Sequence, residues 1–90
     1  MATREQYQEL MSEIVNKQMT VLGPDVALQK ALQVPGLKVD KTGKVSSITG
    51  DEQEILQHLI NVYIELSGAI VKNILNPVFE KYPDISVKIK

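Results

Sequence analysis

Hydrophobic residues in the first quarter of the chain recur at intervals of three and four, which predicts an amphipathic helix over residues 3–22. Thr3 and Gln6 have the spacing of a capping box, in which each side chain accepts a hydrogen bond from the backbone N–H of the other residue. Gln18 interrupts the apolar stripe of this helix. Two interpretations of Gln18 are open: its side chain reaches water near the helix end, or it makes a buried polar contact.

A second, shorter helix is predicted over residues 24–33, directly after Gly23. Pro24 suits the first helical position, because the N–H that proline lacks has no partner there, and Asp25 places a negative charge at the helix N-terminus. The residues expected to face the core are Ala27, Leu28, Ala31 and Leu32. A Val-Pro-Gly sequence at 34–36 ends the helix.

Strand spacing replaces helical spacing after this point. Segment 37–39 alternates apolar and polar residues, and segment 45–49 is β-branched or small, so the two predict a hairpin around a turn at 40–44. Val45 and Ile48 have opposite parity along the second strand. This parity predicts a β-bulge or a strand that is covered on both faces.

A lone hairpin is marginally stable in water and needs a cover or a third strand. Residues 84–90 alternate apolar and polar side chains in the same way. We therefore predict a short C-terminal strand that adds to the hairpin, either in its own chain or in a second chain.

The last predicted helix begins at Asp51 and runs to about Leu75, and Pro77 is expected to kink or break it because proline has no N–H to donate. Its apolar positions cover an arc of roughly 240°, against about 100° for a typical surface helix. About 24 residues at 1.5 Å each would span about 36 Å. A compact domain near this size has a diameter of only about 26 Å.

We therefore predict a twofold homodimer in which the long helices of two copies pack together. The small residues at 67–69 would let these helices approach closely, or they accommodate the first helix of the same chain. The residues predicted to form the interface are Leu59, Val62, Leu66, Ala69 and Ile70.

The composition indicates one soluble α+β domain over residues 1–90, with 43% hydrophobic and 23% charged residues. A net charge of -1 without a basic stripe argues against a nucleic-acid or anionic-membrane surface. The chain has no cysteine, and its N-terminus lacks the apolar region of a secretory signal. No segment reads as a membrane span. We expect a cytoplasmic protein.

The candidate chemical groups are few. His58 is the only histidine and lies four residues after Glu54, as in an exposed helical pair. The acidic residues at 51–54 are explained by capping and by the helix dipole. Because no residues have the spacing of a catalytic group or of metal ligands, we predict no catalytic, metal or cofactor site and no enzyme activity.

The order "VLGPDVALQKALQVPGLKVD…GKVSSITGDEQEILQHLINVYIELSG" resembles small uncharacterised bacterial α+β domains. In these a helix pair, a short hairpin after "VPGL" and a long closing helix follow one another. The resemblance covers most of the chain and implies the fold class, with no activity attached.

The sequence favours a small interaction or regulatory module that homodimerises through its long helix. An alternative is a binding module for a small apolar ligand held between the long helix and the sheet. A third hypothesis is a partner of another protein, whose isolated chain would expose apolar surface.

Overall fold

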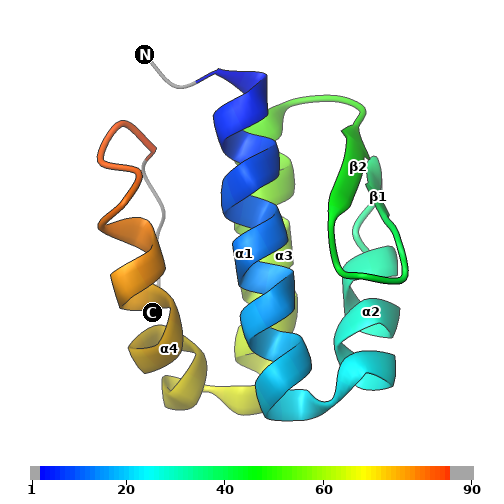
Figure 1. Ribbon diagram of the computed structural model, residues 1–90, viewed down its shortest axis with the longest axis vertical. Coiled ribbons are helices and arrows are strands. Elements are labelled where there is room, and N and C mark those ends of the chain that lie inside the picture. The colour runs from blue at the N-terminus through cyan, green and yellow to red at the C-terminus, as the bar shows by residue number, and fades with distance from the viewer. Residues whose placement is uncertain (1–2, 86–90) are drawn as a thin grey trace.

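The computed structural model describes residues 3–85, and at positions 67 and 69–71 the backbone only. Within this part of the chain it has four helices and one antiparallel hairpin, which confirms the α+β class. The elements are α1 (Arg4–Leu22), α2 (Pro24–Leu32), β1 (Leu37–Val39), β2 (Val45–Ile48), α3 (Glu52–Ser67) and α4 (Ala69–Phe79). Figure 1 shows α1 in the middle, in front of α3, with α4 on one side and the hairpin and α2 on the other.

The two N-terminal helices form as the sequence predicts. Thr3 Oγ1 accepts a hydrogen bond from the Gln6 N–H, and Gln6 Oε1 accepts one from the Thr3 N–H, each at 3.1 Å, so the predicted capping box is confirmed. Gly23 separates α1 from α2. The prediction of a buried Leu32 is wrong, since Leu32 is 60% exposed. The buried residues of α2 are Ala27 and Ala31, and Leu32 points about 100° away from Ala31 and about 140° away from Ala27.

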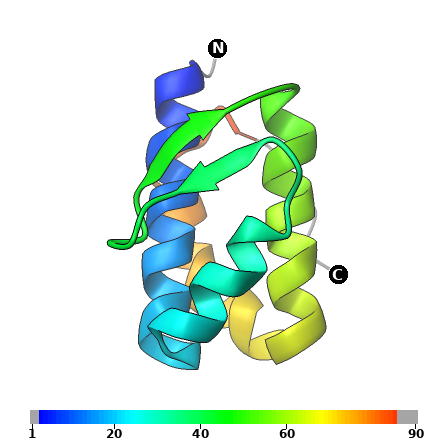
Figure 2. The same cartoon turned by 90° about the vertical axis from the view of Figure 1, so that its right-hand side faces the viewer.

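The hairpin crosses α1 and α3 (Figure 2). Its register shifts between Lys38 and Val39, which confirms the predicted bulge and lets both Val45 and Ile48 face the core. Gly36 precedes β1 with a positive φ of 85°, and its carbonyl accepts the N–H of Thr49 at 2.7 Å. A Cβ at position 36 would lie 2.2 Å from the Thr49 carbonyl oxygen, so only glycine fits.

The described residues hold a sheet of two strands. Asp84 and Ile85 follow α4 in a turn and a bend, and the rest of the predicted C-terminal strand lies outside the described residues. That strand stays a prediction.

The core lies between α1 and α3 and is closed by the remaining elements. Its largest fully buried side chains are Tyr63, Leu10, Met11, Ile14, Leu56, Leu59, Ile60 and Leu75. The Tyr63 hydroxyl donates a 2.8 Å hydrogen bond to the Ala27 carbonyl and so ties α3 to α2. Burial raises the pKa of Tyr63, which keeps this hydroxyl a donor.

The structure differs from the predicted long helix at two positions. It breaks at Gly68, which has φ 57° and ψ -126°, and the chain turns back so that α4 packs beside α1. Pro77, where a kink or break was predicted, lies inside α4 two residues before the helix ends at Phe79. So close to the end, the missing N–H removes only one hydrogen bond of the last turn.

This break removes the geometric argument for a protruding rod. The 16 residues of α3 span about 24 Å, which fits within the 32 Å long axis of the molecule. Leu75 and Val78 of α4 are buried, and Ile60 within the apolar arc of α3 is fully buried. The chain therefore shields by itself much of the apolar arc that was expected to need a partner.

Candidate interaction surfaces

The structure divides the five residues of the predicted interface. Leu59 is fully buried in the core of its own chain, and Val62 is partly buried. Leu66, one residue before the end of α3 at Ser67, is 44% exposed. The side chains of Ala69 and Ile70 lie outside the described part of the chain. Leu66 is thus the predicted residue that the structure places on the surface.

Two other exposed apolar side chains lie on elements that meet at the same end of the molecule as the end of α3. Val21 and Val26 flank the turn between α1 and α2 and are 44% and 40% exposed. Figure 1 shows that this turn and the turn between α3 and α4 lie at the same end of the molecule. We name the surface formed by Val21, Val26 and Leu66 the turn end.

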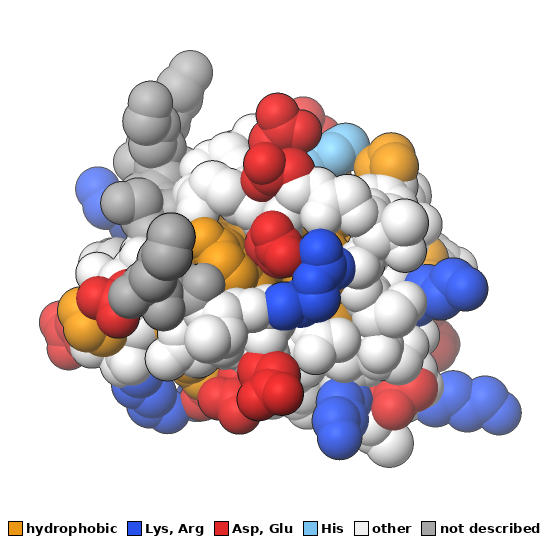
Figure 3. Space-filling view, turned by 90° about the horizontal axis from the view of Figure 1, so that it is seen from above, with side chains coloured by type: hydrophobic (Ala, Val, Ile, Leu, Met, Phe, Trp, Pro, Cys, Tyr) orange, Lys and Arg blue, Asp and Glu red, His pale blue; other side chains and the backbone are white. Residues whose placement is uncertain are grey.

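Charged residues of both signs accompany the turn end. Asp25, Glu65 and Lys72 are exposed on the helix segments next to the two turns. Figure 3 views the opposite end, where acidic side chains gather near the only histidine, His58. The turn end thus combines exposed apolar side chains with charged groups of both signs.

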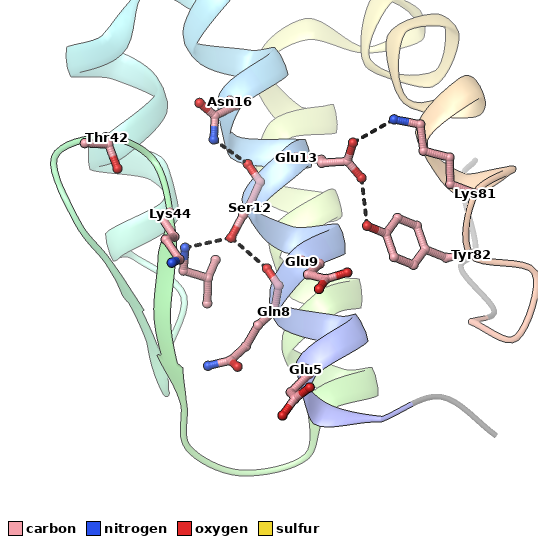
Figure 4. Close-up of a pocket in the computed structure, with 11 residues that line it drawn as sticks. Glu5, Gln8, Glu9, Ser12, Glu13, Asn16, Thr42, Lys44, Lys81 and Tyr82 are labelled. Atoms are coloured by element: carbon pink, nitrogen blue, oxygen red, sulfur yellow. Dashed lines mark hydrogen bonds and ion pairs between the residues drawn. The ribbon is translucent and has the colours of Figure 1, made fainter.

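A second surface is a groove of about 800 Å³ along α1 (Figure 4). Its floor is α1, one wall is the hairpin, and the other wall is the segment after α4. The lining residues are Glu5, Gln8, Glu9, Ser12, Glu13, Asn16, Thr42, Lys44, Val45, Lys81 and Tyr82. The apolar ligand site is predicted between the long helix and the sheet, whereas no described residue of α3 lines this groove, so that site stays a prediction.

Polar side chains of α1 hold the hairpin wall through the free edge of β2. Gln8 donates to the Ser46 carbonyl at 3.4 Å, Asn16 donates to the Gly43 carbonyl at 3.3 Å, Ser12 accepts the Val45 N–H at 2.8 Å, and Arg4 donates to the Ile48 carbonyl. We call Arg4, Gln8, Ser12 and Asn16 the edge row. From Arg4 to Asn16 the helix rises about 18 Å, and the five residue steps from Gly43 to Ile48 span about 16.5 Å of extended chain, so the edge row and its backbone partners run over similar lengths.

The opposite wall is held by one carboxylate. Glu13 accepts hydrogen bonds from Lys81 Nζ at 2.8 Å and from the Tyr82 hydroxyl at 2.9 Å, and we call this set the Glu13 contact. Burial alone would raise the pKa of Glu13, but the bonds from Lys81 and Tyr82 and the charges of Lys81 and Lys17 outweigh it, so this pKa is lowered. Burial, then the bond to Glu13 and the charges of Glu13 and Glu9, raise the pKa of Tyr82 to about 12.

Several polar groups in and beside the groove make structural contacts. Ser12 donates its hydroxyl proton to the Gln8 carbonyl at 2.7 Å while it accepts the Val45 N–H. Asp40 caps the hairpin turn through the Thr42 and Lys44 N–H groups, and these bonds, with the Thr42 hydroxyl foremost, lower its pKa. The geometry therefore favours a role in holding the fold together.

Gln18 lies on the core side of α1 and is fully buried, which excludes the interpretation that its side chain reaches water. Among the described residues, neither its amide nitrogen nor its amide oxygen has a hydrogen-bond partner. An unpaired buried amide group costs about 1–3 kcal/mol of stability. This residue is a weak point of the core.

The remaining candidates have simple positions. His58 is exposed on α3, and the acidic segment before it begins with Asp51, which accepts the Glu54 N–H at 3.0 Å and caps the helix. Over residues 3–85, three or more His, Cys, Asp or Glu side chains nowhere gather as metal ligands would. The described helices include none with the length and apolarity of a membrane span.

The sequence contained a signal for the edge row, although the prediction missed it. Polar residues at intervals of four run beside the apolar stripe of α1, which is the spacing needed to follow a strand edge. The Glu13 contact had no such signal, because it joins residues 69 positions apart.

Comparison of the chain with protein-family models, with curated proteins and with solved structures finds no match. The resemblance to small bacterial α+β domains therefore stays a prediction.

Proposed function

We propose that the chain is a small non-enzymatic interaction module, two copies of which associate through the turn end. The observation that carries this proposal is the 44% exposure of Leu66 near the end of α3, at the same end of the molecule as the turn flanked by the exposed Val21 and Val26. Removal of apolar surface from water contributes about 25 cal/mol per Å².

A second copy is the partner that this surface favours. A twofold interface brings the same patch of each copy together, so apolar groups flanked by charges of both signs let a basic group of one copy face an acidic group of the other. Asp25, Glu65 and Lys72 supply exposed charges of both signs on the helix segments next to the two turns. As part of the same proposal, we place the protein in the cytoplasm.

Sedimentation of the protein up to about 1 mM tests the association, because an equilibrium with a dissociation constant in this range is visible there. The decisive variant is Leu66→Glu, which places a charge in the proposed contact. Its matched control is Leu32→Glu, since Leu32 is the more exposed of the two and lies at the far end of α2.

We expect Leu66→Glu to raise the dissociation constant by tenfold or more, which corresponds to about 1.4 kcal/mol, and Leu32→Glu to leave it unchanged. A wild-type chain that sediments as a monomer at every concentration would contradict the proposal. Equal effects of the two variants would place the contact elsewhere.

A further inference from the structure

The connection between α3 and α4 consists of Gly68 alone. Gly68 is exposed, and a Cβ added to it would meet nothing within 4 Å. The position therefore requires glycine only because φ is 57° and ψ is -126°, a backbone conformation that residues with a side chain rarely adopt.

The sequence around this junction is compatible with one continuous helix. Apolar positions at intervals of three and four continue from α3 across Gly68 into α4, which is why a single helix is predicted from the sequence. What opposes that helix in the isolated chain is packing, since a straight helix would carry α4 away from its own α1.

The contacts that hold α4 are ones that any copy of the chain can provide. Leu75 and Val78 of α4 are buried, and α4 packs against α1 and α3. The segment after α4 adds the Glu13 contact. A second chain offers the same α1 and α3 surfaces and the same Glu13 carboxylate.

We propose that two copies exchange α4. In the exchanged dimer α3 and α4 join through Gly68 into one helix over 52–79, about 42 Å long, and α4 of each copy packs against α1 and α3 of the other. Leu66, next to the junction, then lies in the new contact between the copies. This inference rests on the proposed self-association and specifies how it occurs.

The variant Gly68→Ala tests the role of the junction. Alanine is strained in the observed turn and is favoured over glycine in a continuous helix, so exchange is expected at concentrations lower by tenfold or more. The matched control inserts Gly-Ser-Gly after Gly68. This longer connection relaxes the turn and interrupts the joined helix, so the control is expected to stay monomeric at concentrations where the wild type associates.

A cross-linking experiment on the wild-type sequence detects exchange directly. Unlabelled and 15N-labelled chains are unfolded together, refolded at high concentration and treated with a carbodiimide, which joins a carboxylate to an amine in direct contact. Glu13 and Lys81, 2.8 Å apart, are such a pair. The variant Lys81→Arg has no amine to couple at this position and serves as the control.

Mass spectrometry of the digested dimer gives distinguishable outcomes. Glu13–Lys81 linked peptides with one unlabelled and one labelled partner support the exchange. If both peptides of every linked pair are unlabelled or both are labelled, the dimer forms without exchange. This result overturns the exchange and leaves the proposed association in place. Monomers alone, for both the wild type and Gly68→Ala, overturn both.

Discussion

The two sides of α1 hold their neighbours in different ways. On one side the edge row contacts β2 through the backbone groups of the strand at several successive positions. On the other side the Glu13 contact joins α1 to the segment after α4, and Leu75 and Val78 of α4 are buried in the core. Ser12 and Glu13 are adjacent in sequence, yet they face opposite walls of the groove (Figure 4).

This difference suggests which part of the fold is able to move. Hydrogen bonds to successive backbone groups fix one register, so the hairpin has a single position on α1. The Glu13 contact involves side chains only and sets no comparable register, and a partly exposed ion pair contributes only about 0–1 kcal/mol. We therefore expect the α4 segment to separate more readily than the hairpin, as the proposed exchange requires.

The largest expected effect comes from the substitution Leu75→Ala in α4. Leu75 is fully buried, and removal of a buried leucine side chain lowers the free energy of unfolding by about 2–5 kcal/mol. If α4 is separable, amide hydrogen exchange will show that α4 loses protection before β2 and α1 do. Equal loss of protection across the molecule would contradict a separable α4.

The next effect distinguishes the two neighbours on α1. Ser12→Ala removes the acceptor of the Val45 N–H and is expected to lower the free energy of unfolding by about 1–3 kcal/mol, as measured by urea unfolding. Glu13→Gln is its matched comparison on the α4 side, with an expected loss of up to about 1 kcal/mol. A larger loss for Glu13→Gln than for Ser12→Ala would reverse the comparison.

A stabilising substitution is expected at Gln18. Gln18→Leu replaces a buried amide without hydrogen-bond partners by an apolar group of similar size, which should raise the free energy of unfolding by about 1 kcal/mol or more. Thermal and urea unfolding beside the wild type measure the change. A destabilised Gln18→Leu would indicate that the amide has a polar partner in solution.

The smallest effect is the pH dependence of the Glu13 contact. The pKa of Glu13 is lowered, so its contribution to stability is present above its ordinary value of 4.5 and is lost as the pH falls through the lowered one. The pKa of Tyr82 is raised to about 12, so its contribution is present below 10.0 and is lost as the pH rises through about 12.

The stability difference between the wild type and Glu13→Gln is therefore expected to be largest from about pH 5 to about pH 10, and to stay within about 1 kcal/mol. Urea unfolding of both proteins across this range measures it. A difference that does not change below pH 4 would show that the carboxylate charge contributes nothing.

Local signals in the sequence predicted local structure well. The Thr3–Gln6 capping box, the Gly23–Pro24 boundary and the bulge in β2 each depend on residues close together in the chain, and each is found. The break at Gly68 was missed because one glycine costs a helix only about 1 kcal/mol. The helical periodicity favours a continuous helix across Gly68. The packing of α4 against α1, which the sequence does not reveal, outweighs it.

The candidate surface was only partly predictable for the same reason. Leu59 and Leu66 lie seven residues apart and therefore fall on one apolar stripe of the helix. The sequence pattern predicts both as interface residues. The fold separates them, because other elements cover the middle of α3 while its end projects toward the turns. How deeply each residue of an apolar stripe is buried depends on how far the neighbouring helices and strands extend along that helix.

The side chains that α1 places along β2 also have a topological consequence. They act in place of a neighbouring strand, so the sheet cannot grow on that side. Any additional strand, from residues 84–90 or from a foreign peptide, has only the outer edge of β1 for pairing. Since β1 contains three residues, about 10 Å of chain, such an added strand would be short and would pair on one side of the sheet only.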